Sequence, residues 1–229
     1  MTVGPSAWWY LTRSSGAVAL ILLTVGLLIG VASIGRLGGP GVPRFMVGAV
    51  HRSASLLALV FLSVHILTAV LDSYASISPV NAVLPFTGSY RPLWLGLGAL
   101  AFDLLLAVAV TSLLRRHLGH RAWKAVHWLG YLAWPIALLH ALGTGSDARQ
   151  TWMLAIGVAC AAAVLAAAVA RALIGWPDRA GLRIALLTAA GAFALGLVVW
   201  LPAGPLARGW ARRAGTPAAL LGSSGGGRA

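Results

Sequence analysis

Four histidines stand near the ends of two hydrophobic stretches of this chain. The stretch HRSASLLALVFLSVH begins at His51 and ends at His65, and the stretch VHWLGYLAWPIALLH carries His127 and His140. A histidine costs free energy inside a lipid bilayer, so one found there marks a functional site unless a neighbouring group explains it. Two helices that each carry a histidine near both ends would hold two metal centres at two depths.

The spacing within each stretch decides which helix face the histidines share. His51 and His65 are separated by about 21 Å of helix rise and nearly four turns, so both lie close to one face. His127 and His140 are separated by about 19.5 Å of helix rise, but their spacing does not complete a whole number of turns, so an ideal helix would point them to different sides. Pro135 lies between them, and a proline kink can rotate one half of a helix against the other. We therefore predict that Pro135 lets this second pair serve two stacked centres.

The composition is that of an integral membrane protein. The chain has 229 residues, of which 59% are hydrophobic and 9% charged, and its mean hydropathy is +0.88. Soluble domains carry about 25% charged residues. We predict an all-α bundle of six transmembrane helices, because six runs approach the length of about 20 residues that spans a hydrocarbon core. The runs cover residues 16–34, 47–71, 93–114, 123–143, 151–174 and 182–201.

Basic residues are concentrated in the short connections between these runs. The net charge is +13, from 17 Lys and Arg against 4 Asp and Glu. In a soluble protein this balance would indicate nucleic-acid binding, but here it indicates membrane topology and contact with anionic lipid, and no nucleic-acid partner is expected. The connections after the first, third and fifth runs are the most basic. The positive-inside rule then predicts a multi-pass protein of the cell membrane with both termini outside.

The second and fourth runs cross the membrane in the same direction, which puts the histidines at two matched depths. His51 is then level with His127 on the cytoplasmic side, and His65 is level with His140 on the outer side. Two facing imidazoles without a carboxylate or thiolate cluster suit a b-type haem, whereas zinc takes three or four protein ligands. No C-x-x-C-H motif is present, which excludes covalent c-type attachment. The alternative is that the four histidines only satisfy polar groups within the bundle.

Charged side chains near the two levels have two readings. Arg52, Arg121 and Lys124 lie beside the inner level, where they would pair with haem propionates or only set the membrane topology. Arg91 and Arg149 are the corresponding candidates on the outer side. All five therefore depend on what the histidines bind.

Three further polar groups lie outside this histidine pattern. Asp103 stands in the middle of the third run, where an acid is expensive. It would tune an outer haem, carry a proton, or stay neutral and bond to a Ser or Thr of a neighbouring helix. His117 and His120 fall in a basic connection and are expected at the solvent or lipid surface. The single cysteine, Cys160, is expected to be a small buried hydrophobe.

The chain resembles the ferric reductase-like transmembrane domain family over about residues 8–145. The resemblance rests on WYLTRSSGAVALILLTVGLLIG at 9–30, on HRSASLLALVFLSVH at 51–65 and on TSLLRRHLGHRAWKAVHWLGYLAWPIALLH at 111–140. That family includes the membrane parts of NADPH oxidases and the haem subunit of bacterial methionine sulfoxide reductase. The resemblance implies two b haems, with His51 and His127 on the inner iron and His65 and His140 on the outer iron.

The resemblance also divides the chain into four parts. No FAD or NADPH domain follows the helices, so no flavin is expected on this chain, and a separate flavoprotein or a quinol would supply the electrons. The parts are an N-terminal interfacial segment at 1–15, a haem-binding ferric reductase-like transmembrane core at 16–145, two additional transmembrane helices at 146–202, and a tail at 203–229 that is basic, then rich in Gly and Ser, and disordered.

The expected function is transmembrane electron transfer by a di-haem b-type cytochrome. Electrons would pass from a cytoplasmic or quinol donor to an acceptor outside, which would be a ferric chelate, oxygen or a partner protein docked on the connection at 72–92. The alternative is a haem-bearing membrane subunit of a multi-protein reductase, with no substrate site of its own, and whether the chain is itself an enzyme stays open. A haem-free permease or scaffold is the third candidate.

Overall fold

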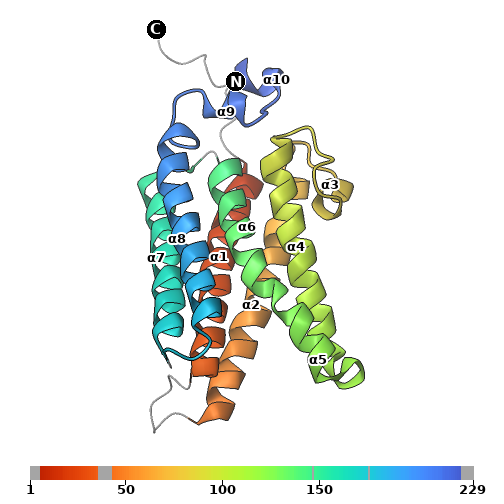
Figure 1. The fold of residues 1–229 in the computed structure, drawn as a ribbon. Helices are drawn as coiled ribbons and strands as arrows, with labels where there is room; N and C mark the ends of the chain where they lie inside the picture. The colour runs from red at the N-terminus through yellow and green to blue at the C-terminus, as the bar shows by residue number, and fades with distance from the viewer. Residues whose placement is uncertain (1–5, 36–42, 146, 175, 223–229) are drawn as a thin grey trace.

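Every element of the structure is a helix within the residues that the computed structural model describes, which are 6–35, 43–145, 147–174 and 176–222. Long helices alternate in direction, and short helices lie at their ends (Figure 1). The helices are α1 (Ala7–Gly35), α2 (Arg44–Leu71), α3 (Pro79–Val83), α4 (Pro92–Leu113), α5 (Arg115–His127), α6 (Leu129–Thr144), α7 (Thr151–Leu173), α8 (Ala180–Ala203), α9 (Trp210–Arg213) and α10 (Ala218–Gly222).

The described chain contains six helical segments that are long and apolar enough to cross a membrane, so it is a multi-pass membrane protein. This confirms the six predicted transmembrane runs. The segments are Ala7–Ser33, Phe45–Leu71, Pro92–Leu113, Arg115–Thr144, Thr151–Leu173 and Ala180–Ala203.

The first helix begins earlier than the sequence predicts. The run was expected to start at 16, after an interfacial segment at 1–15, whereas α1 already begins at Ala7. Ser6 provides the start, because its hydroxyl accepts a hydrogen bond from the main-chain N–H of Trp9 at 3.0 Å. An N-capping serine satisfies one of the free N–H groups at a helix start. Residues 1–5 lie outside the described chain.

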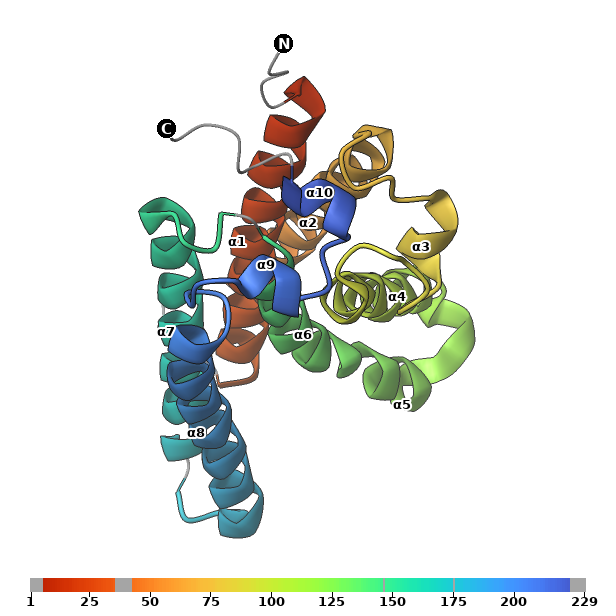
Figure 2. The same cartoon turned by 90° about the horizontal axis from the view of Figure 1, so that it is seen from above.

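The helices pack as two pairs with a further pair at one side. Helix α1 lies along α2, and α4 lies along α6, whereas α7 packs on α1 and α8 packs beside α7 (Figures 1 and 2). The C-terminal ends of α1, α4 and α7 lie at one end of the bundle, and α3, α9 and α10 lie at the other end. The basic stretches that follow α4 and α7 in the described chain therefore share one end of the bundle.

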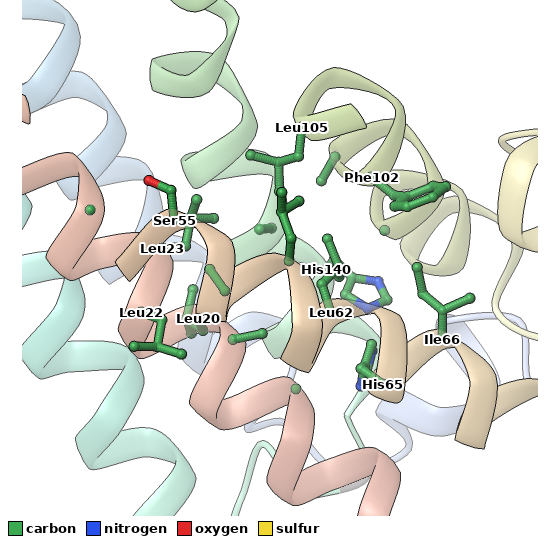
Figure 3. Close-up of a pocket in the computed structure, with 18 of the residues that line it drawn as sticks. Leu20, Leu22, Leu23, Ser55, Leu62, His65, Ile66, Phe102, Leu105 and His140 are labelled. Carbon is green, nitrogen blue, oxygen red and sulfur yellow. The ribbon is translucent and has the colours of Figure 1, made fainter. Parts of the chain in front are cut away.

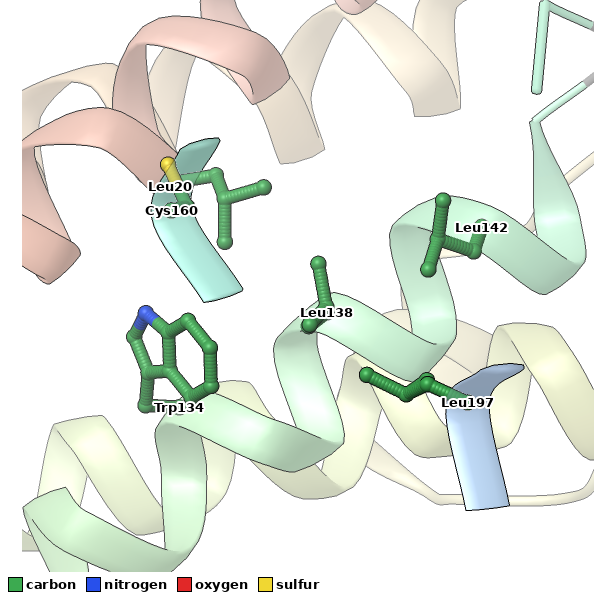
Figure 4. Packing of buried hydrophobic residues seen from close by; sticks show 6 residues of the cluster. All are labelled: Leu20, Trp134, Leu138, Leu142, Cys160 and Leu197. Carbon is green, nitrogen blue, oxygen red and sulfur yellow. The ribbon is translucent and has the colours of Figure 1, made fainter. Parts of the chain in front are cut away.

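The buried core lies where α6 meets α1, α7 and α8. Trp134 is 3% exposed and donates its indole N–H to the hydroxyl of Thr24 at 2.8 Å. Cys160 is buried in this cluster, as the sequence predicts. The cluster consists of Leu20, Trp134, Leu138, Leu142, Cys160 and Leu197 (Figure 4). This core holds α6 against α7 and α8, the two helices that follow the region of family resemblance.

The fourth transmembrane segment is divided at Trp128, which separates α5 from α6. Pro135, at which the sequence predicts a kink, lies inside α6. Helix α5 includes the whole connection expected at 115–122, and its course changes at Gly119, where φ is +73°. The interruption at Trp128 therefore lies between the two histidines of this segment, directly after His127.

The described part of the C-terminal tail is folded against the ends of α4 and α6, where the sequence predicts disorder. Arg91 is 4% exposed, and its guanidinium donates to the hydroxyl of Thr216 at 2.9 Å and to the carbonyl oxygen of Thr144 at 2.9 Å. The indole N–H of Trp210 donates to the carbonyl oxygen of Gly143 at 3.1 Å. Residues 223–229, which include most of the Gly- and Ser-rich end, lie outside the described chain.

Candidate functional site

The four histidines form two facing pairs, and these are the pairs that the sequence predicts. The ring centroids of His51 and His127 are 6.1 Å apart, with an interplanar angle of 69°. The ring centroids of His65 and His140 are 6.2 Å apart, with an interplanar angle of 84°. Each pair thus joins α2 to the fourth transmembrane segment.

Both rings of the His65–His140 pair, which we call the outer pair, are oriented by the main chain. Nδ1 of His65 lies 2.7 Å from the carbonyl oxygen of Thr12, and Nδ1 of His140 lies 2.9 Å from the carbonyl oxygen of Trp94. A carbonyl oxygen only accepts, so each Nδ1 carries the proton and each Nε2 keeps a lone pair. This is the arrangement in which a histidine is prepared to bind a metal through Nε2.

The His51–His127 pair, which we call the inner pair, is held differently. Nδ1 of His51 lies 3.0 Å from the carbonyl oxygen of Gly26. Nδ1 of His127 is buried and has no hydrogen-bond partner within the described chain. Its ring instead stacks on Trp123, with centroids 5.0 Å apart and planes at 28°, and the Trp123 indole N–H donates to Ser112 Oγ at 3.3 Å.

Glycines allow the outer pair to lie directly against the neighbouring helices. A Cβ atom at Gly16 would come within 2.7 Å of the His65 ring, and one at Gly98 would come within 2.5 Å of the His140 ring. Distances under about 3 Å are steric overlap, so glycine is required at both positions. At the inner pair a Cβ atom at Gly30 would lie 3.6 Å from His51, which is ordinary van der Waals contact.

All four histidines line one cavity of about 1060 Å³ between α1 and α2 on one side and α4, α5 and α6 on the other. Pockets for a single small ligand have volumes of about 300–1,000 Å³. Figure 3 shows the outer pair in this cavity, with Leu62 and Ile66 of α2 and Phe102 and Leu105 of α4 around it. The cavity is therefore large, mostly apolar, and continuous from the inner to the outer pair.

Each histidine pair fits a cofactor whose metal is bound by one nitrogen from each of the two facing rings. A metal bound at about 2 Å by one nitrogen of each ring would place the two ring centroids about 6 Å apart, close to the 6.1 Å and 6.2 Å of the two pairs. Within the described residues, no group of three or more His, Cys, Asp or Glu side chains could hold a metal ion. Two imidazoles facing each other in an apolar slot suit haem better than they suit zinc.

The predicted inner cations are only partly brought to this cavity. Arg52 and Lys124 line its wall, whereas Arg121 does not. On the outer side, Arg91 is bonded to main-chain carbonyl oxygens and to Thr216 rather than facing the cavity. Arg149 is exposed and also lies outside the lining.

Arg13 is the outer cation that the sequence reasoning missed. It lines the cavity directly after Thr12, whose carbonyl oxygen meets His65. Its guanidinium forms an ion pair with Asp147 and lies 4.0 Å from the centroid of the Trp9 ring. The sequence analysis starts the first helix at residue 16, so Arg13 falls in the interfacial segment expected at 1–15 rather than in the helix.

Tyr90 adds a polar group to the outer end of the cavity. It lines the wall and is 8% exposed. Burial raises the pKa of the Tyr90 hydroxyl, and the neighbouring Arg91 opposes this shift. The phenol therefore stays protonated at neutral pH, so the outer end of the cavity holds a neutral donor beside the Arg13–Asp147 ion pair.

The remaining polar candidates have different surroundings. Asp103 does not line the cavity, and within the described chain no Ser or Thr of a neighbouring helix bonds to it. His117 is exposed on α5, as the sequence predicts. His120 is exposed as well, but its ring lies 5.5 Å from that of Trp123, on the cavity wall.

Comparison with known protein families finds a match over the helices that carry the histidines. A family model described as "Ferric reductase like transmembrane component" matches residues 15–138. The matched region contains both residues of the inner pair and His65 of the outer pair, and it ends just before His140. No curated protein and no solved structure matches the chain.

Proposed function

The chain belongs to the ferric reductase like transmembrane component family, and we propose that it is a di-haem b-type cytochrome that carries electrons across the membrane. Membership of this family implies transmembrane electron transfer. The observation that carries the finer proposal is the presence of two imidazole pairs, with ring centroids 6.1 Å and 6.2 Å apart, at two depths of one apolar cavity.

The four histidines are proposed to be the residues that would hold the haem irons. His51 and His127 would hold the inner haem, and His65 and His140 the outer haem. When bound, each haem would accept and release one electron through its iron. The carbonyl oxygens that receive Nδ1–H of three of these rings keep Nε2 free to bind, and they raise the basicity of the ligand.

The rest of the cavity is proposed to exclude water and to balance charge. The leucines between the two levels keep the dielectric low, which limits reorganisation around a transferred electron. Arg52 and Lys124 at the inner end and Arg13 at the outer end line the cavity, where each can pair with a haem carboxylate. Arg121 lies outside the lining and is not included in this role.

Electrons are proposed to enter beside α5 and to leave near α3. Helix α5 carries exposed basic residues and no acid, which suits a cytoplasmic flavoprotein with an acidic surface, and a quinol in the bilayer is the other donor considered. The end of the bundle that holds α5 and the last turn of α7 would then face the cytoplasm, with both termini outside. A ferric chelate, oxygen or a partner protein at the 72–91 connection would be the acceptor.

The test is reduction of ferric citrate by the haem-loaded chain in liposomes that enclose dithionite, with ferric citrate outside, so that electrons reach the iron only by crossing the membrane. Steady formation of ferrous iron, lost in His65→Ala and retained in His117→Ala, would support a reductase with its own acceptor site. Reduction of the haems without turnover of ferric citrate would instead support a haem-bearing subunit of a larger reductase. A chain that binds no haem would leave a permease or scaffold and would exclude both forms of the proposal.

A further inference from the structure

Asp103 is the feature that electron transfer through the cavity does not explain. It lies near the middle of α4, about 15 Å of helix rise from either end of the transmembrane segment. This is the depth at which an ionisable side chain is most costly, and such groups in membrane proteins are nearly always paired. The carboxyl group therefore requires a partner.

The described chain itself provides none, because Asp103 lies on the face of α4 that points away from the cavity. Phe102 and Leu105 line the cavity, whereas Asp103 does not. Leu106 and Val110 follow at the spacing that keeps residues on one helix face, and they are 45% and 43% exposed. Within the described residues, Asp103 has neither a hydrogen bond nor an ion pair.

We propose that this face of α4, formed by Asp103, Leu106 and Val110, is the interface with a second copy of this chain. A neutral carboxylic acid has one O–H donor and one free acceptor oxygen, so two such groups can bond to each other reciprocally. Twofold symmetry brings the same residue of both copies to the axis. A second copy therefore satisfies Asp103 with its own Asp103, whereas a different protein would need a donor placed at the same depth.

The residues one turn away on α4 are compatible with close packing of two helices. Ala107 follows Asp103 by one turn, and a small side chain lets two transmembrane helices approach closely. Leu100 precedes Asp103 by one turn and extends the apolar part of the same face toward the outer end. Leu106 and Val110 would then pack against their counterparts across the axis. The cavity lies on the other side of α4, so the interface would leave both histidine pairs accessible.

Cysteine cross-linking in liposomes tests this interface. Cys160 is the only cysteine of the chain, so Cys160→Ala provides a cysteine-free background. Leu106→Cys in this background should form a disulfide-linked dimer on mild oxidation. The matched control is Leu195→Cys, which is 65% exposed in its span but lies on α8, outside the proposed interface. We expect about tenfold less dimer from this control.

Variants of Asp103 then test the carboxyl pair itself. Asp103→Leu should lower the dimer yield of Leu106→Cys about tenfold, because it removes both hydrogen bonds of the reciprocal carboxyl pair. Asp103→Asn should retain most of the dimer, because an amide also donates and accepts. Circular dichroism would verify that both variants keep their helix content. Equal cross-linking at positions 106 and 195, or a dimer yield that Asp103→Leu leaves unchanged, would overturn the proposal.

Discussion

The inner and outer histidine pairs have almost the same ring separation but are held in different ways. Both outer rings bond to main-chain carbonyl oxygens, those of Thr12 and Trp94. In the inner pair only His51 does so, and His127 relies on its stacking with Trp123. The outer pair is therefore fixed by the backbone of α1 and α4, whereas half of the inner pair depends on one side chain.

The outer histidine pair is also packed more tightly against its neighbouring helices than the inner pair. The outer rings lie so close to α1 and α4 that Gly16 and Gly98 cannot carry a Cβ atom, whereas Gly30 beside the inner pair has room for one. The inner pair also lies where α5 and α6 meet, next to the break at Trp128. Two sites with the same ligands should thus respond to different substitutions.

The largest expected effect is the selective loss of one of the two haems when one of its histidine ligands is replaced. His65→Ala and His140→Ala should each abolish the same outer haem, and His51→Ala and His127→Ala the inner one, because a single imidazole does not hold a six-coordinate haem. Haem content per chain would fall from two to one, as measured by the pyridine haemochromogen spectrum. The exposed His117→Ala is the control and should keep both. Loss of different haems in the two outer variants would refute the pairing.

Alanine substitutions of the glycines beside the histidine rings should also affect the outer haem much more than the inner haem. Gly16→Ala and Gly98→Ala should weaken haem binding at the outer level by about 10- to 100-fold, the usual cost of disturbing the groups that orient a ligand. Gly30→Ala should leave the inner level unchanged, since its Cβ atom would lie 3.6 Å from His51. Haem titration of the apoprotein, with the two levels distinguished in the His65→Ala and His51→Ala backgrounds, measures both. Equal losses for all three variants would contradict the difference in packing.

Replacement of Trp123 should weaken the binding of the inner haem and leave the outer haem unaffected. Trp123→Leu removes the ring that positions His127 and should weaken inner haem binding about tenfold. The low-spin electron paramagnetic resonance signal of that haem should also shift, because it responds to the orientation of the axial rings. Trp176→Leu is a suitable control, since Trp176 is exposed and lies outside the cavity lining. An unchanged inner signal in Trp123→Leu would show that the stacking has no role in orienting His127.

The smallest expected effect is a loss of stability that leaves the inner and the outer haem equally in place. Thr24→Val leaves the buried N–H of Trp134 without its acceptor, which should lower the free energy of unfolding by about 1–3 kcal/mol. Neither histidine pair contacts this bond, so both haems should remain. Thermal unfolding in detergent measures the change, with Thr111→Val as control, because Thr111 bonds only to the main chain of its own helix. Selective loss of one haem in Thr24→Val would mean that the core and that level are coupled.

The histidine pairs were predictable because hydropathy gives the number of transmembrane spans, and two even-numbered spans cross the membrane in the same direction. Residues near equivalent ends of the second and fourth spans must then share a depth. Six spans and the buried Cys160 follow from the same apolar pattern. The pairing needed no knowledge of side-chain geometry, only the two spacings and the order of the helices.

The details that hydropathy does not encode were missed. The first helix extends beyond the apolar run to its cap at Ser6, which brings Arg13 to the cavity. The interruption of the fourth span at Trp128 has no glycine or proline at that residue to indicate it, whereas the kink at Pro135 stays a prediction. The folding of the tail depends on Arg91, whose partner Thr216 lies far along the chain. Long-range hydrogen bonds of this kind leave no local signal in a sequence.

The haem content and ligation of the purified chain test the central claim most directly. With haem supplied during expression, the protein should contain two b haems per chain. It should also show a Soret band and two low-spin signals of bis-imidazole ligation, one for each histidine pair. A correctly folded chain without a Soret band, or one that retains two haems after both His65 and His140 are replaced by alanine, would contradict the assignment of the two pairs.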